Sequence, residues 1–143
     1  MTTIAGAKRL NARLVFITAI AGTAWGAFAW LLGARAIGPS IWGGVIASPF
    51  LGVGVAALVH PRFVNAEGWF RGVWALASVY LGATGFSLAC GTFAFLRSNG
   101  GRTELLFEPV IGVLWGVTMT GYLLFLWPLA YLTHWWLEFR RGA

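Results

Sequence analysis

Long apolar stretches alternate with short charged ones along this chain. Every Lys, Arg, Asp and Glu falls within residues 1–13, at Arg35, or within 62–71, 97–108 and 138–141. The uncharged runs between them, 14–34, 36–61, 72–96 and 109–137, have 21, 26, 25 and 29 residues. A helix needs about 20 apolar residues to cross the hydrocarbon core of a bilayer. Each run is therefore long enough to cross once and too short to cross twice.

This pattern predicts an all-α integral membrane protein, an antiparallel up-down bundle of four transmembrane helices. The expected helices cover about 12–34, 40–60, 70–96 and 108–137, and residues 1–143 form a single transmembrane domain. Gly38-Pro39 marks the first turn, and Ser40 is placed to cap the second helix. The connection around 60–71 mixes aromatic and charged residues, which favours a segment on the membrane surface.

Composition and charge placement support this fold and orient it. Residues are 59% hydrophobic and 10% charged, whereas about a quarter are charged in soluble domains. The net charge of +6 is spread over the helix ends and forms no stripe that could follow nucleic acid. Basic residues are retained on the cytoplasmic side. Seven of the ten basic residues lie on the same side as both termini: Lys8, Arg9, Arg13, Arg62, Arg71, Arg140 and Arg141. This excess predicts that both termini are cytoplasmic (N-in and C-in) in a bacterial cytoplasmic membrane.

Small residues recur at helical spacing in three of the expected helices. In lipid such faces let helix backbones approach closely, which favours helix packing over other roles. Because three helices carry them, one face is expected to remain for a partner. The candidate packing residues are Gly22, Gly26, Gly33, Ser78, Gly82, Gly85, Ala89, Gly112 and Gly116.

Tryptophans divide into boundary and deeper positions. Trp69, Trp74, Trp135 and Trp136 fall at the inner boundary and Trp42 near the outer one, as in an aromatic belt. Deeper tryptophans such as Trp127 need a hydrogen-bond acceptor for the indole N–H, for example a backbone carbonyl.

His60 and His134 are the candidate cofactor ligands. Helices two and four run in the same direction, so both histidines fall at a similar depth near the inner face. Two imidazoles from neighbouring helices can ligate a haem, and one can ligate the magnesium of a chlorophyll-type pigment. The alternative is a pair of interfacial histidines hydrogen-bonded to water or headgroups.

Glu104 and Glu108 share a helix face at the outer boundary, which makes them a candidate ion site. Acids at a helix N-terminus also complement its dipole. The chain has no Asp, no His or Cys cluster and no phosphate loop, so no catalytic or metal site is expected and the chain is not predicted to be an enzyme.

Three functions remain open. The favoured one is an accessory subunit that packs, within lipid, against other subunits of a larger membrane complex. The others are a small homo-oligomeric transporter or channel, and a haem- or pigment-binding membrane subunit. Sparse extramembrane chain and uncharged spans favour the first.

Overall fold

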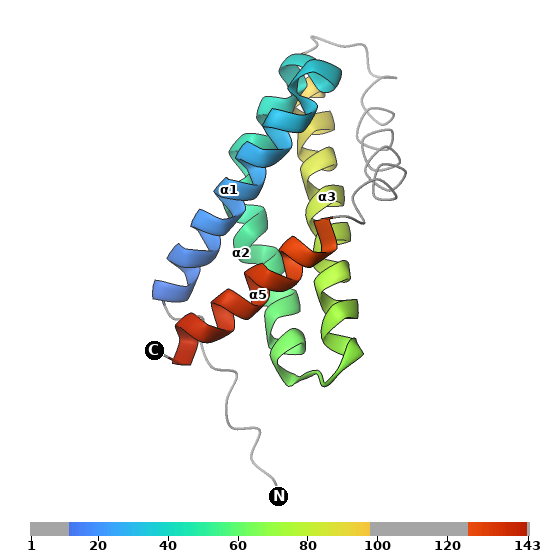
Figure 1. The fold of residues 1–143 in the computed structure, drawn as a ribbon. Helices are drawn as coiled ribbons and strands as arrows, with labels where there is room; N and C mark the ends of the chain where they lie inside the picture. Colours follow the sequence, from blue (N-terminus) through green and yellow to red (C-terminus); the bar gives the residue numbers. More distant parts are fainter. Residues whose placement is uncertain (1–11, 98–125, 143) are drawn as a thin grey trace, which may run out of the picture.

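The computed structural model describes residues 12–97 and 126–142, and all of its regular structure is helical. Its elements are α1 (Ala12–Ile37), the 3₁₀ turn η1 (Gly38–Ser40), α2 (Ile41–Asn65), α3 (Trp69–Arg97) and α5 (Trp127–Gly142). Figure 1 shows α1, α2 and α3 as long, roughly aligned helices, with α5 crossing them obliquely. The start of α1, the α2–α3 connection and the end of α5 lie toward the same end of the bundle.

Three helices are long and apolar enough to cross a membrane. They cover Leu14–Leu31, Gly38–Asn65 and Trp69–Arg97. They indicate a membrane-integral protein, in agreement with the three corresponding runs of the sequence. Residues 108–125 of the expected fourth helix lie outside the described ranges, and 127–137 belong to α5, which has 16 residues.

Two glycines with positive φ allow the short connections. Gly38 has φ +66° in the turn between α1 and α2, and Gly68 has φ +55° before α3. Side chains strain the backbone in this region, whereas glycine does not. Ser40 differs from expectation, because it has helical angles within η1 and its side chain makes no capping hydrogen bond.

The second helix is longer than the sequence indicated. It was expected to end near residue 60, but α2 continues through Pro61 to Asn65, and only residues 66–68 separate it from α3. Proline inside a helix loses a hydrogen bond and costs about 3 kcal/mol. The added turn buries Phe63 completely in the cluster with Ala75, Val79 and Ala130, and this close packing favours continuing the helix past Pro61. Much of the expected surface segment is therefore helix.

The core lies near the α2–α3 connection. Phe63, Ala75, Val79 and Ala130 form a buried cluster, bringing together α2, α3 and α5. Along the rest of its length α2 packs against both α1 and α3.

Candidate functional site

His60 of α2 and His134 of α5 lie side by side at the end of the bundle that contains the α2–α3 connection. Their ring centroids are 5.8 Å apart and their planes are 14° from parallel. His60 is 2% exposed and His134 is 4% exposed. Two histidines 74 positions apart in sequence thus form one buried pair, because α5 crosses α2 at this level.

Phe63 joins the pair one turn further along α2. Its ring stacks on His134 at 5.1 Å and meets Tyr131 edge-on at 5.2 Å. The guanidinium of Arg71 lies 5.5 Å from the centre of the Phe63 ring, on the far side of the connection. We call His60, Phe63, Arg71, Tyr131 and His134 the aromatic cluster.

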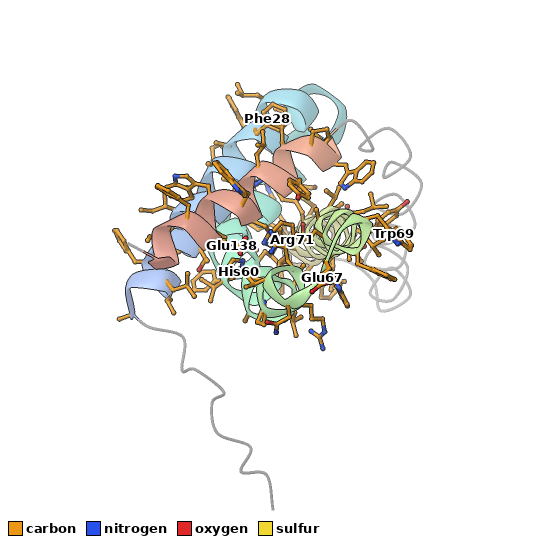
Figure 2. All side chains as sticks on the ribbon, turned by 60° about the horizontal axis from the view of Figure 1, so that its bottom comes forward. Phe28, His60, Glu67, Trp69, Arg71 and Glu138 are labelled. Carbon is orange, nitrogen blue, oxygen red and sulfur yellow. The ribbon has the colours of Figure 1, made fainter. Side chains whose placement is uncertain are left out.

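Arg71 ties three segments together at the edge of this cluster. Its Nε donates to the carbonyl of Ala66 at 3.0 Å and its Nη2 to that of Val64 at 3.4 Å. Its two Nη atoms also reach the carboxylate of Glu138 on α5, at 3.3 and 3.4 Å. Figure 2 labels Arg71, Glu138 and His60 in this region. One arginine therefore caps the last turn of α2 and pairs with α5.

The environment of His134 keeps its ring neutral. Burial and, to a smaller extent, the neighbouring His60 lower the pKa of His134 from its ordinary 6.5 to about 4. The Nδ1 atom of His134 is buried and has no hydrogen-bond partner among the described residues. An uncharged imidazole is the form that tolerates this packing, since burying an unpaired charge is costly.

The aromatic cluster does not fit a haem. Ligation by both histidines requires the macrocycle to pass between the two rings, yet both rings are almost fully enclosed and Phe63 covers His134. A chlorophyll-type ring on one imidazole meets the same obstacle. In residues 12–97 and 126–142, no group of three His, Cys, Asp or Glu side chains gathers to hold a metal ion. The arrangement supports a packing role for both histidines.

Of the candidate packing glycines, two set the contact between α1 and α2. A Cβ on Gly22 would lie 2.8 Å from the Cα of Gly52 and would meet the carbonyl of Ser48. A Cβ on Gly26 would meet the Ser48 side chain. These helices therefore touch backbone to backbone, as small residues permit.

The α3 candidates are used unevenly. A Cβ on Gly85 would meet the end of the Leu51 side chain at 2.6 Å, whereas one on Gly82 would meet no atom of the described helices within 4 Å. Ala89 lies against Gly43, and Ser78 donates to the carbonyl of Ala75 at 2.7 Å. Gly33 lies near the end of α1. Four candidates lie outside the described residues: Glu104, Glu108, Gly112 and Gly116.

The contact residues of α2 were not anticipated, although a signal was present. Gly44, Ser48 and Gly52 recur every four residues, which is the spacing of a helix-packing face. Phe63 was placed in the connection around 60–71 and Arg71 at the border between that connection and the third helix, so their contacts could not be foreseen. Trp127 finds an acceptor of the kind its indole requires, because its Nε1–H donates to the carbonyl of Gly72 at 2.8 Å.

Hydroxyl groups on the described helices mostly bond to their own backbone. Thr18, Thr23, Ser48, Thr92 and Thr133 each donate to a carbonyl three or four residues earlier. These hydroxyls thus make their hydrogen bonds locally and do not form a continuous polar path along the bundle.

Comparisons of the chain with protein families, with curated proteins and with solved structures found no match.

Proposed function

We propose that this protein is an accessory subunit of a larger complex in a bacterial cytoplasmic membrane, with both termini on the cytoplasmic side. The observation that carries the proposal is an open apolar groove between α2 and α3. The proposed occupant is a transmembrane helix of a different subunit.

The groove has a volume of about 450 Å³ and lies toward the end of the bundle away from the α2–α3 connection. Thr92 is the one residue with a polar side chain in its lining, and its hydroxyl already donates to the carbonyl of Leu88 at 2.8 Å. The groove therefore offers an occupant apolar contacts alone. Its lining consists of Gly43, Ile46, Ala47, Phe50, Leu51, Gly85, Leu88, Ala89, Thr92, Phe93 and Leu96.

Small residues continue beyond the groove toward the middle of the bundle. Because α2 and α3 are antiparallel, with Gly43 against Ala89 and Leu51 against Gly85, Gly54 and Gly82 fall at about the same level. Gly54 lies four residues after Phe50 on α2, and Gly82 lies three residues before Gly85 on α3. Residues three or four apart share a helix face, so both glycines lie on the groove side. Among the described residues, a Cβ on either glycine would meet nothing within 4 Å. Another helix can therefore approach both backbones closely, which is how helices associate in lipid.

A helix fits this surface better than a transported solute does. A selective path needs polar or charged groups along it, whereas the hydroxyls of Thr23, Thr92 and Thr133 each bond to their own backbone. Gly22, Gly26 and Gly52 are already in close contact between α1 and α2, so they leave no space for another helix. On the α2–α3 surface a Cβ on Gly54 or Gly82 would meet no described residue within 4 Å, so these two positions support docking.

Site-specific photo-crosslinking in native membranes tests the docking surface. A crosslinking side chain at Phe50, which is 77% exposed beside the groove, is expected to capture one copurifying subunit. The same side chain at Phe16, which is 68% exposed on α1, is the matched control and should not capture it. Gly82→Leu should abolish the Phe50 adduct because it occupies the approach path without a clash in the monomer.

Other adducts would decide against this function. If Phe50 reacts only with lipid, the groove faces the bilayer. If it reacts only with a second copy of this chain, a homo-oligomer such as a small transporter is favoured. An adduct that persists unchanged in Gly82→Leu would show that the small-residue surface is not the contact.

A further inference from the structure

The contacts of α5 are gathered at one end of α3. Trp127 donates to the carbonyl of Gly72, and Glu138 pairs with Arg71. These two α5 residues are eleven positions apart, which is about 16 Å along a helix axis, whereas their partners are adjacent on α3. A helix packed lengthwise along α3 would find partners spread over a similar length. α5 therefore crosses α3 near its first turns.

The view in Figure 1 agrees with these contacts, since α5 runs obliquely across the aligned helices. Its buried side is formed by Ala130, His134 and Leu137, which are each under 5% exposed. That side rests on α2 and α3 through the aromatic cluster. The opposite side is left uncovered by the described residues.

The uncovered side of α5 is apolar and aromatic throughout. At 100° per residue its members fall on one arc opposite the buried side, and each is at least 40% exposed: Leu129, Leu132, Trp135, Trp136 and Phe139. Arg140 and Arg141 follow directly along the helix. Tryptophan beside basic residues is the composition of the boundary between acyl chains and headgroups.

We propose that α5 is a membrane-boundary helix, which lies at a shallow depth with its aromatic side against the lipid and its basic end at anionic headgroups. It does not run along the membrane normal as the inner half of a fourth span. The partner of this surface is thus the bilayer, and the proposal is independent of whether a subunit occupies the α2–α3 groove. The oblique crossing and the uncovered aromatic side together carry it.

Depth measurements with nitroxide labels test this placement in the full-length protein. Cys90 is replaced by Ala, and single cysteines are introduced at Leu129 and Trp136, which lie seven residues apart on the exposed side of α5. Phe16 and Thr23 are the matched pair, also seven apart and exposed, on the candidate span α1. Seven residues correspond to about 10 Å of helix axis. Accessibility to oxygen and to a water-soluble nickel complex gives each depth in bilayers of phosphatidylcholine and phosphatidylglycerol.

The expected depth difference for the α5 pair is less than half of that for the α1 pair, with both α5 labels at the acyl–headgroup boundary. Equal differences for the two pairs would show that α5 runs along the membrane normal and would overturn the proposal. Free access of the nickel complex to both α5 labels would overturn it as well, because the aromatic side would then face water. Circular dichroism of each labelled variant confirms that the compared proteins are folded.

Discussion

At the scale of single residues, Gly22 and Gly52 set the distance between α1 and α2. Each glycine occupies the place where the other would carry a Cβ, with 2.8 Å from a Cβ on Gly22 to the Cα of Gly52. The atoms in the way belong to the backbone and cannot rotate aside. A Cβ on Gly82, by contrast, would meet no described atom within 4 Å. A larger side chain is therefore expected to clash at Gly22 and to be accommodated at Gly82.

Gly22→Ala is therefore expected to destabilise the folded protein by about 1–3 kcal/mol through overpacking. Gly82→Ala is the matched control and should be neutral or stabilise by up to about 1 kcal/mol, since alanine favours helix. Unfolding in detergent, followed by circular dichroism, measures both. Equal loss in the two variants would contradict the backbone contact between α1 and α2.

His134 links the folded state to pH. Its pKa of about 4 lies below the ordinary 6.5, so above pH 6.5 the ring is neutral in both folded and unfolded chains. As pH falls below 6.5 the unfolded chain takes up the proton first, and stability falls until about pH 4. His60 lies beside the ring, with 5.8 Å between the two ring centroids.

At pH 5 this single group should lower the unfolding free energy by about 2 kcal/mol relative to pH 7.5. His134→Phe keeps an aromatic ring on Phe63 and removes the proton site. The fall in melting temperature between pH 7.5 and pH 5 should therefore be smaller in His134→Phe than in the parent. An identical fall in both proteins would mean that His134 is already protonated or solvated in the folded state.

The residues of the aromatic cluster show what sequence could and could not predict. The shared direction of helices two and four predicted a similar depth for His60 and His134, and the structure places their rings 5.8 Å apart. Phe63 was assigned to a connection because Pro61 commonly ends a helix. Its contact with His134 depends on tertiary burial, which no local pattern expresses.

At the scale of elements, Arg71 holds the α2–α3 connection and α5 together. Its guanidinium group donates hydrogen bonds to the carbonyls of Val64 and Ala66 and to the Glu138 carboxylate. Arg71 and Glu138 are 29% and 31% exposed, so the ion pair is partly screened. The carbonyl contacts are therefore expected to outweigh the ion pair.

Glu138→Gln should cost less than about 1 kcal/mol, whereas Arg71→Ala should cost about 2 kcal/mol because two carbonyls also lose their donor. Arg62→Ala is the control, since exposed Arg62 bonds within its own helix and lies over Trp74. Thermal unfolding of the three variants ranks their losses of stability. A larger loss for Glu138→Gln than for Arg71→Ala would show that the ion pair dominates.

Element boundaries were less predictable than element existence. Charge-free runs located α1, α2 and α3 because lipid demands about 20 apolar residues per crossing. The continuous run 109–137 gave no sign that a helix begins at Trp127 and crosses the others obliquely. Pro128 lies in the first turn of α5, where proline suits a helix start.

At the scale of the whole molecule, three apolar helices form a thin bundle whose described surface is largely apolar. Within the part of the chain that the structure describes, a compact core joins α2, α3 and α5 at the connection end. The groove and open glycines lie on α2 and α3 away from that core. The buried core and the proposed docking surface therefore lie in different parts of the bundle.

The central claim is that this chain works within a larger membrane complex, and its subunit ratio after gentle extraction from native membranes tests that claim most directly. Mass analysis of the purified protein should find a different, larger subunit in a fixed ratio, and Gly82→Leu should reduce that ratio at least several-fold while the chain stays folded. Recovery of the parent protein only as a homodimer or homotetramer, with solute flux after reconstitution into liposomes, would contradict the account and favour a small transporter.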